Sequence, residues 1–188
     1  MKRIIYLAVA IPAFFLSSCG NGTLTPEEEK FELNQQITEL ETKLRKNTEE
    51  RIDPKDASEI LDLYHTFSDK FPEEEIAPEY LFKAGEVSMG IGNYQRAIGY
   101  FERIRKDYPN FDKSPESLFI IGFIYDSYLQ QKGKAKEVYE KVIAEYPEHK
   151  FAEDAKASIN LLTMTDDELI EMFQQKNSPD SLDADTTI

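Results

Sequence analysis

The chain has 188 residues, of which 40% are hydrophobic and 31% are charged, a balance that predicts a folded body with a packed core. Asp and Glu number 36 against 22 Lys and Arg, so the formal net charge is −14. Such an acidic chain repels phosphate backbones, and we expect no nucleic-acid partner. A single Cys excludes an intrachain disulfide and a Cys-cluster metal site, and two His residues leave little material for imidazole catalysis.

The first residues have the pattern of a secretory signal peptide. Lys2 and Arg3 form a basic start, and an apolar run follows over residues 4–16. As a helix this run would span about 20 Å, which is too short for a hydrocarbon core of about 30 Å. Small residues follow the run, as at a signal cleavage site. We therefore predict a signal peptide over residues 1–18.

The only Cys follows this signal directly, in the sequence Leu16-Ser17-Ser18-Cys19. This segment resembles the lipobox of bacterial lipoproteins. The resemblance implies cleavage before Cys19 and a thiol that carries diacylglycerol. It also implies more than one acyl chain on the new N-terminus, which is enough for stable anchoring. The alternative is a structural Cys in an ordinary signal or core.

Residues 19–25 are expected to form a flexible tether between the lipid and the body. In lipoproteins of this type an Asp directly after the Cys retains the protein in the inner membrane, and here Gly20 occupies that place. The resemblance therefore implies the outer membrane, with the body on the periplasmic face. Display on the cell surface is the alternative.

The rest of the chain contains an internal repeat. Gly85 matches Gly122 at a spacing of 37 residues, and Phe101 matches Tyr139 at 38. An aromatic residue followed by Pro recurs at about the same spacing, at Phe71-Pro72, Tyr108-Pro109 and Tyr146-Pro147. A period of this length is typical of arrays of helix pairs.

Each period divides into two helices. Pro78 and Pro115 suit the first turn of a helix, and Ser114 is a suitable N-cap. Gly92 and Gly133 are expected to mark the turn inside each pair. The aromatic-Pro dipeptides end the second helices, because Pro clashes with helix continuation. We expect those second helices over residues 93–107 and 134–146.

This pattern resembles the tetratricopeptide repeat. That family has a small residue and an aromatic in the first helix, Ala and an aromatic in the second, and a final Pro. Those places are held here by Gly85, Ser88, Ala97, Phe101 and Pro109, then by Gly122, Tyr125, Ala135, Tyr139 and Pro147. Three features depart from the family: Leu81 and Leu118 replace a frequent Trp, Ser88 replaces an aromatic, and an insertion near Gln131 lengthens the period. The resemblance implies an all-α solenoid of antiparallel helix pairs.

The flanking segments complete the predicted organisation. Thr25-Pro26-Glu27-Glu28 is a capping box that opens a long helix over residues 26–50. The helical array is expected over 51–175, with a degenerate repeat that ends at Pro72, a lone helix over 152–163, and a C-terminal capping helix that starts near Thr165. The clear repeats cover about 78–109 and 115–147, and residues 176–188 form an acidic tail that we expect to be disordered.

The long N-terminal helix has an apolar stripe of about two heptads, formed by Leu33, Ile37, Leu40 and Leu44. A coiled coil needs about three to four heptads, so we expect this helix to pack on the repeats. A structural oligomer formed through the helix is the alternative.

The repeats offer a candidate binding groove. By analogy with the family, its positions are Phe82, Glu86, Met89, Phe119, Phe123 and Asp126. Apolar side chains with acidic neighbours favour a peptide or helix ligand, whereas burial against flanking helices is the alternative. The basic clamp with which some members of the family hold a C-terminal carboxylate is missing, and this disfavours such a ligand.

The sequence shows no phosphate loop, nucleophile elbow or metal-spaced His pair, so we expect no enzyme, cofactor, metal or small-molecule substrate. His65 and His149 are expected on the surface. The prediction is a lipid-anchored periplasmic scaffold that binds envelope proteins or peptides and reaches the membrane through Cys19. It is similar to outer-membrane assembly lipoproteins and to Tol-Pal-associated repeat proteins. An accessory subunit of an envelope enzyme is the alternative.

Overall fold

The computed structural model describes residues 24–46, 52–165, 167–168, 170–171 and 174. The predicted signal peptide, Cys19 and the tail over 176–188 lie outside these residues. The described chain is all-α and has no strand. Its elements are α1 (Pro26–Lys46), α2 (Pro54–Lys70), α3 (Ala77–Gly90), α4 (Tyr94–Asp107), α5 (Ser114–Phe123), the π-helix η1 (Ile124–Tyr128), α6 (Lys132–Glu145) and α7 (Lys150–Thr163).

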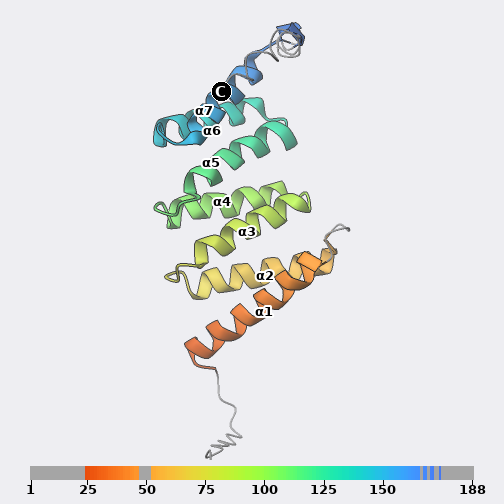
Figure 1. The fold of residues 1–188 in the computed structure, drawn as a ribbon, viewed down its shortest axis with the longest axis vertical. Helices are drawn as coiled ribbons and strands as arrows, with labels where there is room; N and C mark the ends of the chain where they lie inside the picture. The colour runs from red at the N-terminus through yellow and green to blue at the C-terminus, as the bar shows by residue number, and fades with distance from the viewer. Residues whose placement is uncertain (1–23, 47–51, 166, 169, 172–173, 175–188) are drawn as a thin grey trace, which may run out of the picture.

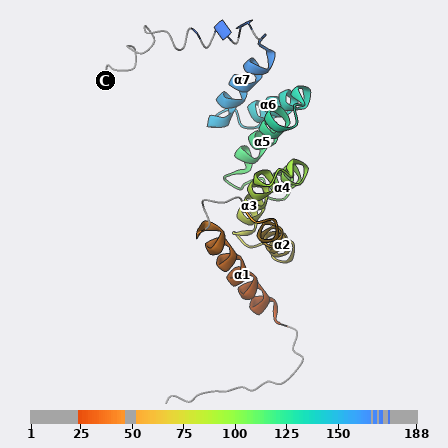
Figure 2. The same ribbon diagram turned by 90° about the vertical axis from the view of Figure 1, so that its right-hand side faces the viewer.

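Successive helices run antiparallel and pack on their neighbours in chain order, which makes an elongated stack (Figure 1). Helices α1, α3, α5 and α7 lie on one face and α2, α4 and α6 on the other (Figure 2). We call the former the first-helix face. The turns inside the helix pairs lie along one side of the stack and the loops between pairs along the other. The stack confirms the predicted solenoid of helix pairs.

The aromatic-Pro dipeptides end helices as predicted. Phe71, Tyr108 and Tyr146 are the C-caps of α2, α4 and α6, with φ of −128°, −132° and −132° and ψ of 56°, 59° and 54°. The backbone N–H of each donates to the carbonyl four residues earlier. The next residue is Pro, which has no N–H to continue the helix. Three helix pairs thus end in one geometry.

The within-pair turns of the two clear repeats differ. Gly92, with φ of +77°, makes the turn between α3 and α4. In the next pair Gln130 takes this role with φ of 53°, and Gly133 lies in the first turn of α6. The prediction that Gly133 marks the turn was therefore wrong. Gly133 could adopt the left-handed conformation, but the chain adopts it earlier, at Gln130, and α6 has already begun at Gly133.

The extra residue is accommodated by η1. The Leu129 N–H donates to the Ile124 carbonyl at 3.0 Å, five residues earlier, which is the π-helical pattern. The Gln130 side chain then donates from Nε2 to the carbonyls of Asp126 and Ser127, each at 3.0 Å. One residue inserted before the turn explains why first helices repeat at 37 residues and second helices at 38.

Helix starts follow the predicted caps only in part. Thr25 and Glu28 form the expected reciprocal capping box at α1, with the Thr25 N–H donating to Glu28 Oε2 at 2.8 Å. Ser114 is not an N-cap: it is the first residue of α5, and its Oγ lies 3.3 Å from the Tyr146 hydroxyl. Asp53 and Asn93 are caps that the sequence analysis missed: Asp53 accepts the backbone N–H groups of Lys55 and Asp56, and Asn93 accepts that of Arg96.

The N-terminal helix α1 packs on the array through its apolar stripe, in which Ile37 and Leu40 are buried. Polar contacts support this packing. The Tyr80 hydroxyl donates to Asn34 Oδ1 at 2.7 Å, and the Tyr64 hydroxyl donates to Glu41 Oε1 at 2.8 Å. Because the chain itself covers the stripe, an oligomer formed through α1 would need another surface.

Each clear repeat is held by a ring packed against a glycine. A Cβ placed on Gly85 would lie 2.5 Å from the Phe101 ring, and one on Gly122 would lie 2.7 Å from the Tyr139 ring. Phe101 and Tyr139 are fully buried. Because Gly has no side chain, the aromatic ring of the second helix can pack directly against the backbone of the first helix.

We expect Gly85→Ala and Gly122→Ala each to lower the free energy of unfolding by about 1–3 kcal/mol, because the added methyl overpacks the helix pair. Gly99→Ala is the matched control, since nothing lies within 4 Å of a Cβ at Gly99 on α4. It should stabilise the chain by up to about 1 kcal/mol through helix propensity. Urea denaturation followed by circular dichroism measures both. Equal effects at the three sites would contradict the packing argument.

Ser88 stands where the family carries an aromatic residue, and it is a buried polar group without a partner. Its side chain is fully buried, and its Oγ has no hydrogen-bond partner among the described residues. Ser68 is equally buried, but its Oγ lies 2.9 Å from the Tyr64 carbonyl and 3.1 Å from that of Ala77.

We expect Ser88→Ala to raise the free energy of unfolding by about 1 kcal/mol, because it removes an unsatisfied buried hydroxyl. Ser68→Ala should lower that free energy by about 1 kcal/mol, because it removes a satisfied one. Thermal unfolding of the two variants side by side tests this pair. A loss of stability in Ser88→Ala would mean that its hydroxyl is bonded in the native protein.

Candidate functional site

The six predicted groove residues have different environments on the first-helix face. Phe82 on α3 is only 4% exposed. Its ring meets Phe101 edge-on with centroids 5.5 Å apart, and Lys113 Nζ lies 4.6 Å from its centroid. Phe82 therefore belongs to the core. It does not line an open groove, and the alternative prediction of burial against other helices is correct for this residue.

Phe119 on α5 is half-buried between two neighbouring helices. Its ring stacks on Phe151 of α7 with centroids 5.0 Å apart and planes 19° apart. It also contacts Tyr139 of α6 at a centroid distance of 5.4 Å. Phe119 thus joins three helices, and a structural role accounts for its contacts.

Phe123 and Met89 are more accessible. Phe123, the last residue of α5, is 38% exposed and meets Tyr128 edge-on with centroids 5.6 Å apart. Met89 near the end of α3 is half-buried against the main core. The face therefore has one clearly exposed aromatic ring among the predicted positions.

Glu86 and Asp126 supply negative charge on the same face. Partial burial raises the pKa of both carboxyl groups; the charge of Lys113 opposes this rise at Glu86, and that of Lys132 opposes it at Asp126. Glu86 forms no ion pair among the described residues. Glu86 is nevertheless exposed, so its carboxylate can accept a cation from a ligand.

The nearby lysines are already paired, and these pairs join successive first helices. Lys83 on α3 donates to Glu41 on α1 at 2.8 Å, and Lys113 before α5 donates to Glu79 on α3 at 2.8 Å. These contacts hold the first-helix face together and leave Glu86 as an acceptor for an external group.

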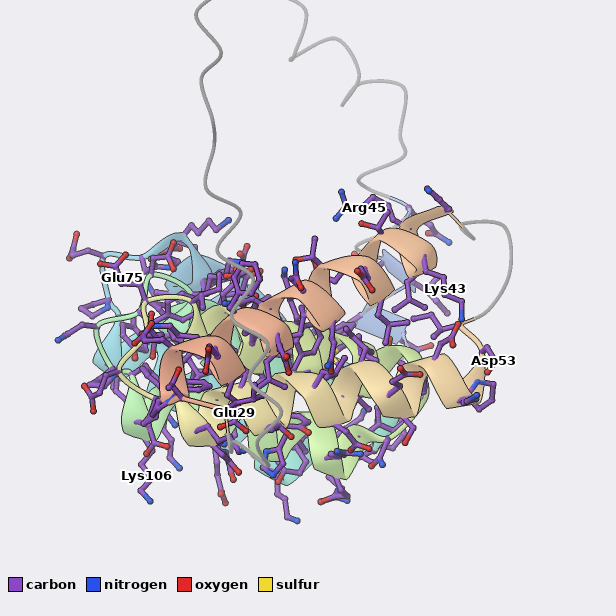
Figure 3. The ribbon with its side chains drawn as sticks, turned by 90° about the horizontal axis from the view of Figure 1, so that it is seen from below. Glu29, Lys43, Arg45, Asp53, Glu75 and Lys106 are labelled. Carbon is purple, nitrogen blue, oxygen red and sulfur yellow. The ribbon has the colours of Figure 1, made fainter. Side chains whose placement is uncertain are left out.

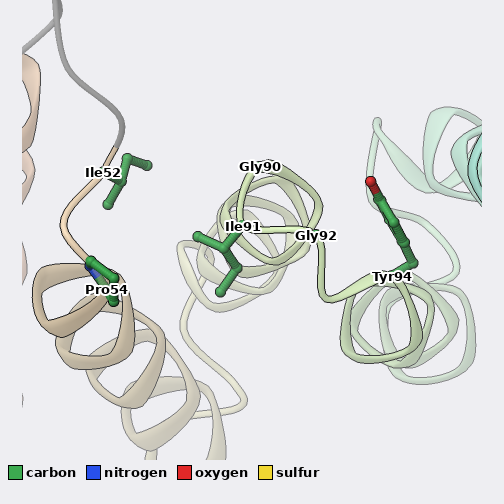
Figure 4. Close-up of a pocket in the computed structure, with 6 residues that line it drawn as sticks. All are labelled: Ile52, Pro54, Gly90, Ile91, Gly92 and Tyr94. Carbon is green, nitrogen blue, oxygen red and sulfur yellow. The ribbon is translucent and has the colours of Figure 1, made fainter.

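A second apolar surface lies along the turns inside the pairs, and the sequence analysis missed it. Tyr94 at the start of α4 stacks on Tyr128 of η1, with centroids 4.4 Å apart and planes 19° apart. A pocket of about 620 Å³ lies beside Tyr94, where Ile52 and Pro54 face Ile91 (Figure 4). The sequence does contain an indication of this surface, because bulky apolar residues flank the predicted within-pair turns.

The described residues do not form a recognisable reaction centre. They contain no group of three or more His, Cys, Asp or Glu side chains that could hold a metal. Exposed His65 pairs with Asp69 at 3.3 Å. Half-buried His149 caps α7 by accepting the Phe151 N–H on Nδ1 at 3.3 Å. None of the described helices is both long and apolar enough to cross a membrane.

The family model of the tetratricopeptide repeat matches residues 79–110 and residues 116–149. Both segments are therefore similar in sequence to this repeat. The first comprises α3 and α4, and the second comprises α5, η1 and α6. A search of curated proteins finds no match to the chain. Tetratricopeptide repeats typically form interaction scaffolds without enzymatic activity, because their stacked helices present an extended binding surface.

We expect Phe119→Ala and Phe123→Ala to differ in their effect on the free energy of unfolding. Phe119→Ala should lower the free energy of unfolding by about 2–3 kcal/mol, because it leaves a cavity between α5, α6 and α7. Phe123→Ala should lower it by less than about 1 kcal/mol, because its ring is already partly in solvent. Thermal denaturation provides the measurement. A larger loss in Phe123→Ala would assign that ring to the core.

Proposed function

We propose that this chain is a lipid-anchored scaffold that binds proteins or peptides in a bacterial cell envelope. The observation that carries the binding role is the pair of tetratricopeptide repeats over 79–110 and 116–149. On their first-helix face, exposed Phe123 offers an apolar contact, and Glu86, which has no ion-pair partner in the described part of the chain, offers a carboxylate. This combination suits a peptide or helix that carries an apolar side chain and a basic one.

The proposed anchor depends on the lipobox-like segment Leu16-Ser17-Ser18-Cys19. Cleavage before Cys19 would leave seven residues, 19–25, ahead of α1. Fully extended, these span at most about 25 Å, so the start of α1 would stay close to the membrane surface. Gly20 after the Cys supports the outer membrane and its periplasmic face as the location.

Within the envelope, the candidate roles are outer-membrane protein assembly and Tol-Pal-linked envelope maintenance. Both depend on repeat proteins that hold other envelope proteins together. The long leading helix α1 departs from the first class, and the lipobox departs from the second. The general role of an envelope scaffold is therefore the proposal.

We expect Cys19→Ala to abolish labelling with radioactive palmitate and to release the protein from washed membranes, because no other thiol exists in the chain. Ser18→Ala is the matched control and should keep both properties, since a small residue still precedes the Cys. Fractionation of cells that express each variant measures the outcome. Firm membrane association of Cys19→Ala would refute the anchor while leaving the repeats intact.

A further inference from the structure

The side of the stack that holds the within-pair turns carries unpaired cations. Arg45 and Lys46 end α1, Lys55 lies in the first turn of α2, and Lys132 and Lys134 begin α6. Among the described residues none of these five forms an ion pair; Lys134 instead places Nζ 5.2 Å from the ring centroid of Tyr125. The whole chain has a net charge of −14, so a cluster of cations on one side is unusual for it.

The carboxylates near these cations are mostly engaged. Asp53 accepts the backbone N–H groups of Lys55 and Asp56 as the N-cap of α2. Asp56 is paired with Lys43 at 2.7 Å. The partly buried carboxyl of Asp126 has a raised pKa, which the charge of Lys132 opposes. Apart from Lys132, whose charge already favours ionised Asp126, the cations on this side remain available to an external anion.

The opposite side of the stack carries acidic runs, together with basic residues at the ends of α2 and α4. The first turn of α1 carries Glu27, Glu28 and Glu29, and the loop after α2 carries a second run over residues 73–75. Viewed along the stack, Glu29 and Glu75 lie toward one edge, with Lys106 also on that side, whereas Lys43 and Arg45 lie toward the other, where Asp53 also lies (Figure 3). Both edges therefore carry both signs, and what distinguishes the turn side is its set of cations without an ion pair among the described residues.

Exposed apolar side chains lie between the unpaired cations. Ile52 is 37% exposed, Ile91 44% and Tyr128 45%. The pocket beside Ile91 and the stacked pair of Tyr94 and Tyr128 make one apolar strip that follows successive turns. We call this strip, together with Arg45, Lys46, Lys55, Lys132 and Lys134, the turn edge.

We infer that the turn edge binds an acidic segment of a partner protein, one in which carboxylates are interleaved with aliphatic or aromatic side chains. The apolar side chains of that segment occupy the pocket between Ile52 and Ile91 and pack on Tyr128. Its carboxylates lie beside the lysines at the start of α6 and the cations around the end of α1. This surface adjoins the first-helix face where Phe123 contacts Tyr128, but it offers cations, whereas the first-helix face offers the carboxylate of Glu86.

A protein partner fits the turn edge better than the membrane to which the chain is proposed to be anchored. The 21 residues of α1 span about 31 Å along the helix axis, from its start near the proposed anchor to its end at the turn edge. The seven residues 19–25 reach at most about 25 Å, so the lipid does not reach the turn edge when α1 stands upright on the bilayer. This step rests on the proposed anchor, whereas the charges and the pocket do not.

The test uses the purified full chain and a short fluorescent peptide that alternates glutamate with isoleucine and tyrosine. We expect saturable binding that weakens with added salt. A peptide with lysine in place of glutamate should not bind. The double variant Lys132→Glu with Lys134→Glu, and separately Tyr128→Ala, should each weaken binding by about tenfold or more.

The matched control is Lys106→Glu with Lys141→Glu, which reverses two exposed cations that lie away from the turn edge and form no ion pair among the described residues. It makes the same change in net charge and should bind the peptide as the unmodified chain does. Circular dichroism melting checks that every variant is folded.

Two results would overturn the inference. Equal weakening in the turn-edge variants and the control would mean that only net charge matters. Binding to phosphatidylglycerol vesicles in preference to the peptide, with loss in Lys132→Glu and Lys134→Glu, would assign the turn edge to lipid. Neither result bears on the Cys19 anchor, whose failure is detected by palmitate labelling instead.

Discussion

The contact between a bare helix backbone and an aromatic ring holds each tetratricopeptide repeat together. Gly85 receives Phe101 and Gly122 receives Tyr139, and in both cases a methyl group would occupy space that the ring already fills. This contact fixes how closely the two helices of a pair approach. Each helix pair also packs on the next one. The distance between the helices of a pair therefore affects where the side chains of neighbouring pairs lie in the stack.

The stack places the two ends of α1 on opposite sides of the molecule. Its first turn carries Glu27, Glu28 and Glu29, and its last turn carries Lys43, Arg45 and Lys46. Such a distribution also suits the helix dipole, most clearly in α1. The first-helix face and the turn edge therefore offer a carboxylate and a set of cations to different groups, even though the whole chain is strongly acidic.

The π-helix η1 shows how an insertion can be absorbed without loss of the repeat. One extra residue before the within-pair turn converts a single turn of helix to π-helix. The Gln130 side chain donates hydrogen bonds to two backbone carbonyls of this π-helix. The second helix still presents Tyr139 to Gly122. The insertion instead brings Tyr128 into position to stack on Tyr94, which joins neighbouring turns into one apolar strip.

Much of the fold follows from the sequence alone, because Gly85 and Gly122, the aromatic partners and the aromatic-Pro stops recur at a fixed spacing and act locally. The lipobox-like segment around Cys19 is likewise a matter of sequence, and its role stays a prediction. Only the tertiary structure decided which groove residues are accessible, since burial depends on neighbouring helices: Phe82 is covered and Phe123 is not. It also decided the turn edge, because side chains from three separate turns meet there only after the helices have stacked.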